Sequence, residues 1–320
     1  PEAVTVVDSA GIRITLSRDK PAVYVRVDST PFLSLGGPED TGPTQFFRIQ
    51  NLHVDPVGRL WVADGQSCEL RIFQADGSHW KTRGGQGEGP GEFLRIRLLG
   101  PQAGDTVLVA DDGTGRASVF DPDGEFVRSH RLVSGDGPVP RLFGAFRDGS
   151  VLGQVPRIVA ASALEPGQLL GDSVHLVRVD LDSTTRQPYA MALGPLWIWT
   201  GRNQVPMPFT INSSFDIQGE AVHLVSGTEF RIRVFERGRL TEVYGVDRGA
   251  RRVTSDDMDA YRQLMEGSLS EETLQDYLSG LDHESRPDLL PAYSRLEVAA
   301  AGEVWVRIYD ADPVAEAIPR

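Results

Sequence analysis

The chain has 320 residues, of which 40% are hydrophobic and 24% charged, and this ordinary globular composition excludes disorder as the dominant state. Its formal net charge of −13 argues against nonspecific binding to nucleic acid or to an anionic membrane surface, because both need clustered lysine and arginine. The single cysteine, Cys68, excludes an internal disulfide framework and a cysteine-based metal cluster. No run of about 18 apolar residues is present, so no transmembrane segment is expected.

A repeat with a period of 47 residues organises the chain. Three pairs of residues share this offset: Asp64 and Asp111, Phe73 and Phe120, Gly77 and Gly124. Asp55, Gly58, Gly84 and Phe93 also have the same residue types one period earlier, at Asp8, Gly11, Gly37 and Phe46. The fourth unit follows at 148–152 and 174–180, split by an insertion, and the fifth and sixth at 219–235 and 296–308, which gives six units.

Each unit consists of short apolar stretches bounded by Asp-Gly or Arg-Gly turns, the signature of β-hairpins. Four short strands per unit with a period in the forties are typical of a β-propeller. The sequence therefore predicts an all-β fold, a six-bladed β-propeller of four-stranded antiparallel blades. It would form a single domain over residues 1–320.

The segment Arg83–Phe93, Arg-Gly-Gly-Gln-Gly-Glu-Gly-Pro-Gly-Glu-Phe, follows the last strand of one unit. With Leu60–Asp64 and Arg71–Phe73 upstream, it resembles the inter-blade loop of bacterial six-bladed β-propeller proteins related to the NHL-repeat group. The resemblance implies an exported protein, often lipid-anchored, in a family mostly without assigned activity. The first residues, Pro1-Glu2-Ala3, lack Met and a signal-peptide pattern, which is compatible with processing and an extracytoplasmic location.

Two insertions interrupt the period. Residues 156–172 are expected to form a long loop between the two middle strands of the fourth unit. Residues 254–293, between the fifth and sixth units, are expected to form two short helices. Thr254 with Asp257 resembles a capping box, and Ser270 begins the second helix.

The sixth unit is too short for two full outer strands, since the strand with Trp305 is followed only by the stretch 311–319 and the last residue. Either the N-terminal strands near Val4–Val7 and Ile12–Leu16 complete it, or the chain lacks those strands.

Several patterns indicate structural roles more than chemistry. The Gly84–Gly91 run lacks the following helix that a phosphate-binding loop needs. Asp121–Glu125 could hold calcium, yet its counterpart 47 residues earlier is a plain hairpin turn, so no cofactor is expected. Asp64 and Asp111 end strands, where an Asp side chain usually caps backbone N–H groups; a ring of acceptors near a central channel is the alternative.

The most suggestive segment is Leu196–Arg202, with Trp197 and Trp199 at alternate positions next to Arg202, followed by Pro206–Phe209. The two Trp rings could form an aromatic floor for a sugar or a peptide, or could pack between blades or against the helical insertion. Further candidate ligand-binding residues lie just before or in inner strands: Arg95, Arg97, Arg141 and Asn212.

Known six-bladed relatives include calcium-dependent lactonases and zinc-dependent lyases. Asn212 suits such a site, but the lactonase pattern around it is missing. His175 and His223 occupy comparable strands in different units, where a lone His is more often a half-exposed sheet residue than a zinc ligand.

A non-enzymatic recognition propeller that binds a peptide, a glycan or a partner protein on its loop face is therefore the preferred hypothesis. A metal-dependent hydrolase or lyase with an ion in the central channel is the alternative.

Overall fold

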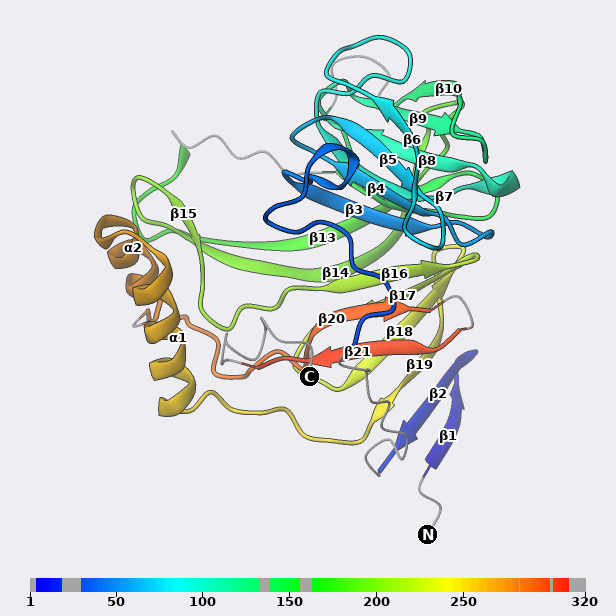
Figure 1. The fold of residues 1–320 in the computed structure, drawn as a ribbon. Helices are drawn as coiled ribbons and strands as arrows, with labels where there is room; N and C mark the ends of the chain where they lie inside the picture. Colours follow the sequence, from blue (N-terminus) through cyan, green and yellow to red (C-terminus); the bar gives the residue numbers. More distant parts are fainter. Residues whose placement is uncertain are drawn as a thin grey trace. The chain divides into compact units, whose positions relative to one another are not determined.

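The computed structural model describes residues 4–18, 30–132, 138–155, 163–281, 283–299 and 302–310. The protein is mostly β with two α-helices (Figure 1). It separates into two compact units. The repeat-bearing unit comprises 28–156 and 176–189, and the helix-bearing unit comprises 1–27, 157–175 and 190–320. Among the described residues, neither helix has the length and apolar character to cross a bilayer.

Two antiparallel meanders of four strands form most of the repeat-bearing unit, which is the strand order of propeller blades. The first contains β3 (Ile49–Val54), β4 (Leu60–Asp64), β5 (Glu69–Phe73) and β6 (His79–Gly84). The second contains β7 (Ile96–Pro101), β8 (Val107–Asp111), β9 (Arg116–Phe120) and β10 (Phe126–Arg131). Strands β4 and β8 begin and end 47 residues apart, so the sequence period is a structural period.

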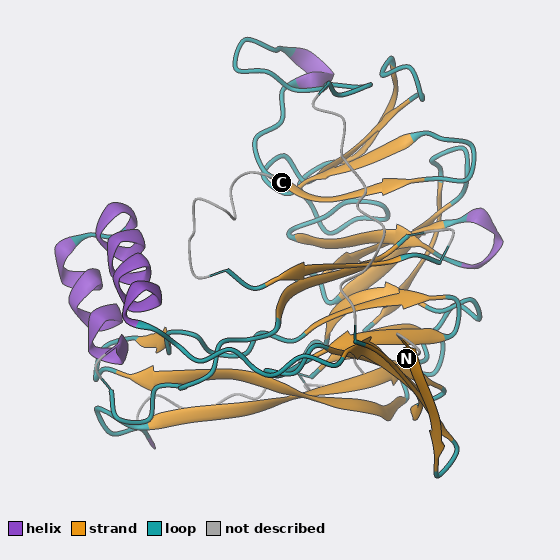
Figure 2. Cartoon of the chain, turned by 90° about the horizontal axis from the view of Figure 1, so that it is seen from below, coloured by secondary structure: helices purple, strands orange, loops and turns teal. Residues whose placement is uncertain are grey.

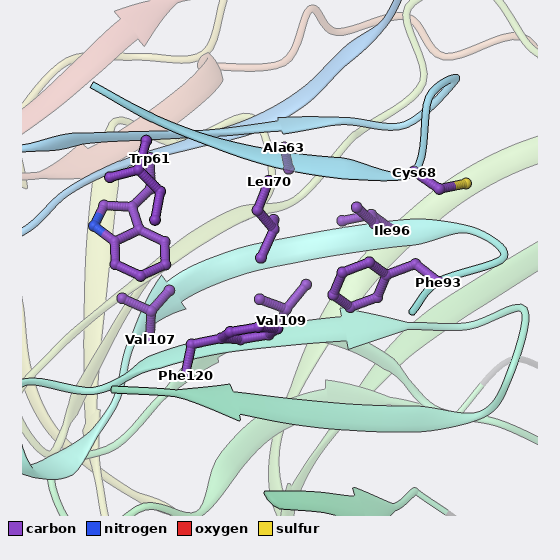
Figure 3. Close-up of a cluster of buried hydrophobic side chains, with 10 residues drawn as sticks. Trp61, Ala63, Cys68, Leu70, Phe93, Ile96, Val107, Val109 and Phe120 are labelled. Carbon is purple, nitrogen blue, oxygen red and sulfur yellow. The ribbon is translucent and has the colours of Figure 1, made fainter. Parts of the chain in front are cut away.

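The core of this unit lies between the two meanders (Figure 3). Trp61 of β4 and Leu70 of β5 are fully buried against Val107 and Phe120 of the second meander. Phe93, at the end of the glycine-rich segment, contacts the Phe120 ring with their centroids 6.1 Å apart.

The same ring contact occurs one period earlier, between Phe46 and Phe73 at 5.9 Å. The repeat therefore conserves the packing between successive segments as well as the strands.

A five-stranded sheet follows, in the order β11-β12-β13-β14-β15. Its strands are β11 (Arg141–Ala145), β12 (Val151–Gln154), β13 (Leu169–Val179), β14 (Arg186–Trp199) and β15 (Gln204–Pro206). The insertion predicted as a loop over 156–172 does lie between β12 and β13, and its residues 156–162 are outside the described residues. From Leu169 onward the predicted loop is part of a strand, since β13 begins there and is 11 residues long. Its neighbour β14 is also long, with 14 residues.

The helix-bearing unit contains a third meander, β16 (Ser214–Gln218), β17 (Ala221–Val225), β18 (Arg231–Glu236) and β19 (Arg239–Val246). The N-terminal strands β1 (Val4–Ser9) and β2 (Ile12–Ser17) join this sheet, with β2 parallel to β19. The last sheet pairs only β20 (Tyr293–Val298) with β21 (Val304–Ile308).

Of the two alternatives for the sixth unit, the one in which the N-terminal strands complete it is therefore wrong. In the described residues they pair with the fifth unit instead, where they satisfy the backbone groups of the β19 edge.

The two predicted helices are confirmed as α1 (Ser255–Ser268) and α2 (Glu271–Leu281), which lie side by side in Figure 2. Thr254 and Asp257 form the predicted capping box, with each side chain accepting the other's backbone N–H. Tyr261 of α1 packs against the buried Phe209 ring at 5.7 Å. Burial in this cluster raises the pKa of Tyr261, so its hydroxyl is neutral at physiological pH.

Candidate functional site

One face of β14 carries a row of apolar side chains that the rest of the described protein covers only in part. The row, called here the β14 stripe, consists of Met191, Leu193, Pro195, Trp197 and Trp199. Met191 is 64% exposed and Leu193 53%, and the other three are half-buried. Alternate residues of a strand share a face, so these five side chains point the same way.

The opposite face of β14 is covered. Ile198 is buried in a cluster with Val205 and Met207. Leu196, also on β14, and Tyr277 of α2 pack against that cluster. The helical insertion therefore contacts the face opposite Trp197 and Trp199. Ile198 and Leu196 are the β14 side chains in the cluster with Tyr277 of α2. Packing of the two Trp rings between blades or against the helices stays a prediction.

The backbone of β14 is held along the whole stripe. Trp197 is paired with Pro206 and Trp199 with Gln204 of β15. Further along, the Leu193 N–H donates to Ser226 Oγ at 2.9 Å, and the Leu193 carbonyl accepts from Ser213 Oγ at 2.5 Å. These bonds fix the strand from both ends of the stripe, so the apolar side chains stand on a rigid support.

Arg202 lies in the turn that joins β14 to β15. Its guanidinium pairs with Asp276 of α2 at 3.4 Å and is 56% exposed. Asn203 Nδ2 donates to the same carboxylate at 3.1 Å. Asp276 is buried and thus fastens the turn to the helix, which keeps Arg202 beside the Trp199 end of the stripe.

Asn212 is exposed and precedes β16, so the expectation that it sits in an inner strand is wrong. It lies in the segment 207–213, which runs along β14. Met207 N–H donates to the Leu196 carbonyl at 2.8 Å, and the neighbouring Ser213 bonds Leu193. Trp197, Trp199 and Arg202 therefore lie at one end of the stripe, and Asn212 adjoins the residue that bonds Leu193.

The remaining arginines predicted for the site lie in the repeat-bearing unit. Arg95 and Arg97 both pair with Asp112, at 2.5 and 3.1 Å. Arg141 begins β11 and lies over the Phe143 ring at 5.5 Å. Arg95 and Arg97 thus form ion pairs within one repeat, and all three arginines belong to the repeat-bearing unit, whereas the stripe belongs to the helix-bearing unit.

Two buried carboxylates cap backbone N–H groups at strand ends, as predicted. Their bonds recur with the period of 47: Asp64 accepts from Phe47 and Arg48, both at 2.9 Å, and Asp111 accepts from Leu94 and Arg95 at 2.8 and 2.9 Å. Burial alone would raise the pKa of Asp64, but these N–H donors and the Arg71 guanidinium lower it below its ordinary value. Both carboxylates are therefore structural acceptors.

The glycine-rich segment closes on itself as a turn. Gly85 N–H donates to the Cys68 carbonyl at 2.8 Å, and Gly89 N–H donates to the Glu92 carboxylate at 2.8 Å. The segment leads into β7 through the buried Phe93. This agrees with a structural turn and not with a phosphate-binding loop.

A polar cluster that the sequence did not predict surrounds His223 of β17. The side chain is 8% exposed, and its Nδ1 lies 2.9 Å from the Tyr244 hydroxyl. Asp216, directly across on β16, accepts the Val298 N–H of β20 at 2.8 Å. Burial lowers the pKa of His223, against the opposite effect of Asp216 and Glu242, and burial raises the pKa of Tyr244 to about 12.

The expectation of a half-exposed histidine is therefore wrong for His223, whereas His175 is exposed. Both histidines stand in a Val-His-Leu-Val stretch, so the local sequence does not predict that one is buried and the other exposed. The burial of His223 comes with the packing of β20 on β17. Within the ranges that the structure describes, no three His, Cys, Asp or Glu side chains are grouped so that they could hold a metal ion. Asp121 accepts the Glu125 N–H at 2.8 Å, the bond of a hairpin turn.

No family model matches the chain, and no curated protein is similar to it in sequence. Three solved structures resemble parts of the fold. A protein of Bacteroides fragilis that is inferred to be exported is 12% identical over 72% of this chain and 60% of its own, with a TM-score of 0.44. A member of the DUF4221 family from Bacteroides vulgatus is 12% identical over 68% and 65%, with a TM-score of 0.43.

The virginiamycin B lyase of Staphylococcus aureus is 10% identical over 66% of this chain and 58% of its own, with a TM-score of 0.37. The matched part is less than two thirds of each of these three proteins. Identities this low say nothing about the activity of this chain.

Proposed function

We propose that this protein is a non-enzymatic recognition module that binds an extended ligand along the β14 stripe. The observation that carries the proposal is the row of apolar side chains on one face of β14, which is exposed at Met191 and Leu193 and ends in two half-buried Trp rings. Exposed apolar patches on folded proteins commonly mark binding sites. Trp is also among the residues that contribute most to binding, because it gives a large contact area with few rotatable bonds.

The polar groups beside the stripe support this function. Arg202 presents a partly exposed guanidinium at one end, and Asn212 presents an exposed amide alongside. An amide both donates and accepts hydrogen bonds, so it suits a peptide backbone or sugar hydroxyls. Apolar area with a few placed polar groups is the usual composition of a binding site.

The scaffold belongs to the same proposal. It is a six-bladed propeller related to the NHL-repeat group, formed as one domain over 1–320, and the period of 47 and the Arg83–Phe93 segment support it. The extracytoplasmic location rests on the same family resemblance. Calcium at Asp121–Glu125 and a metal-dependent hydrolase or lyase stay as alternatives, and metal analysis of the purified protein with a chelator thermal shift tests both.

The proposal is tested by screening the purified chain against peptide and glycan arrays and repeating the screen with the double variant Trp197→Ala/Trp199→Ala. We expect binding to be lost while the melting temperature stays within a few degrees. Trp305→Ala is the matched control, since Trp305 lies on β21 of the same unit and is 46% exposed.

A collapse in stability of the double variant would assign both rings to the core and contradict the proposal. Equal loss of binding in Trp305→Ala, or binding that the double variant retains, would place the ligand elsewhere. Absence of any bound ligand on both arrays would count against a recognition function.

A further inference from the structure

We propose that Met191 is a reversible oxidation site, at which a peroxide converts the exposed end of the β14 stripe from apolar to polar. Control of ligand binding by this step rests on the proposed function, whereas the oxidation itself does not. Three features of the chain carry the inference: the exposure of the Met191 thioether, the protection of the other sulfur atoms, and the position of Met191 on the surface of a fixed strand.

Met191 is the methionine of this chain that solvent reaches most easily. The chain has four methionines. Met191 is 64% exposed, whereas Met207 is 1% exposed in an apolar cluster. Met258 and Met265 of α1 are half-buried, and Met258 packs against a second apolar cluster. A peroxide in solution reacts according to access, so Met191 should be oxidised before the other three.

The thiol of Cys68 competes poorly for the same oxidant. Cys68 is buried, and its Sγ donates to the Leu94 carbonyl at 3.5 Å. Burial, with the nearby carboxylates of Asp111 and Asp64, raises the pKa of the thiol. The thiolate is the form that attacks a peroxide, so little of the reactive species is present at neutral pH.

The oxidation is a two-electron oxygen transfer that needs only the peroxide. The thioether sulfur attacks one peroxide oxygen, the S–O bond forms and the O–O bond breaks. The sulfur is oxidised to the sulfoxide, and hydrogen peroxide is reduced and leaves as water with both of its hydrogens. The side chain keeps its length and gains a polar oxygen.

The position of Met191 lets this change occur without disturbing the fold. Ala192, the next residue, is 6% exposed and points to the opposite face, so the covered side of β14 is not altered. The backbone beside Met191 is held by the bonds of Leu193 to Ser226 and Ser213. A sulfoxide at Met191 therefore stays in contact with water, whereas one at Met207 would lie inside an apolar cluster.

A polar oxygen at this place should weaken the binding of any ligand that covers Met191. The ligand would remove water from the sulfoxide oxygen, which is a hydrogen-bond acceptor. Leu193 and Pro195, the next members of the stripe, carry no side-chain donor that could replace the water. We expect binding to weaken about fivefold to tenfold when Met191 is oxidised.

Graded treatment of the full chain with hydrogen peroxide, followed by peptide mapping in a mass spectrometer, tests the site. We expect sulfoxide at Met191 before Met258 and Met265, and at Met207 last. Methionine sulfoxide reductases of both stereospecificities should then restore the Met191 thioether. Oxidation of Met258 or Cys68 ahead of Met191 overturns the assignment, and a sulfoxide that the folded chain protects from both reductases overturns its reversibility.

Hydrophobic-interaction chromatography then measures the change of the surface, at the peroxide dose that oxidises only Met191. The oxidised chain and the variant Met191→Gln should elute earlier than the untreated chain, with melting temperatures within about 2 °C of it. Peroxide should not shift the elution of Met191→Leu. Met258→Leu is the matched control and should shift as the wild type does. Unchanged elution of the oxidised wild type, or an equal shift in Met191→Leu, contradicts the proposal.

Binding of the peptide or glycan captured on the arrays separates this inference from the proposed function. If the chain oxidised at Met191 binds it as tightly as the untreated chain, control of binding is wrong and the recognition function stands. If neither array yields a ligand, the recognition function is wrong, and the peptide map and the elution still decide the oxidation site.

Discussion

Replacing Asp64 by Ala should destabilise the repeat-bearing unit by about 3–5 kcal/mol. The buried carboxylate accepts the N–H groups of Phe47, Arg48 and Gln66 at 2.9, 2.9 and 3.2 Å. It also lies 3.6 Å from the Arg71 guanidinium. Each N–H left without an acceptor in a buried place costs about 1–3 kcal/mol, and water entering the gap offsets part of the sum.

Chemical denaturation of the purified variant, followed by intrinsic fluorescence, measures this cost. Asp111→Ala should cost the same within about 1 kcal/mol, because the repeat places the same bonds on Leu94 and Arg95. Asp123→Ala is the control: this exposed hairpin residue should stay within about 0.5 kcal/mol of wild type. The reasoning is refuted if Asp64→Ala is as mild as the control, or if the two capping sites differ by several kcal/mol.

Three other changes test local features. Thr254→Ala should lower the free energy of unfolding by about 1 kcal/mol and speed amide hydrogen exchange in the first turn of α1. Unchanged exchange would contradict the capping box. Gly84→Ala should cost more than about 2 kcal/mol in urea unfolding, because φ is +90° and the new Cβ would lie 2.8 Å from the Cys68 carbonyl oxygen. Gly249→Ala, which has no atom within 4 Å of its Cβ and no positive φ, should cost clearly less, and equal costs would count against the steric argument. His223 has a pKa below its ordinary 6.5 in the fold, so its contribution to stability is complete above about pH 6.5 and is lost as the pH falls below it. Melting temperatures from pH 8 to 5 should therefore fall less steeply for His223→Gln, and parallel profiles would contradict this.

The sequence predicted the regular part of the fold well because the repeat preserves specific contacts. An offset of 47 relates the strands β4 and β8, the Phe46–Phe73 and Phe93–Phe120 ring pairs, and the two aspartate caps. Each of these needs one residue type at one position. Such anchors are visible in the sequence, and so was the capping box of α1.

Pairing between distant strands was not predictable in the same way. Residues 4–17 carry strand patterns that would suit several sheet edges, and the structure pairs β2 in parallel with β19. Backbone hydrogen bonds decide that choice, and they are the same for any sequence of β-forming residues. The extent of β13 was missed for a related reason, because Leu169 and Leu170 fit a buried loop as well as a strand.

The β14 stripe shows which part of a binding site a sequence can reveal. Trp197 and Trp199 stand out by type and spacing, yet 190–199 is apolar at both odd and even positions, so periodicity alone cannot assign either set to the core. Ala192 and Ile198 are buried on one face, whereas on the other face Met191 and Leu193 are exposed and Pro195, Trp197 and Trp199 are half-buried. Large apolar residues are usually buried, so the free energy of covering Met191 and Leu193 is available to a ligand.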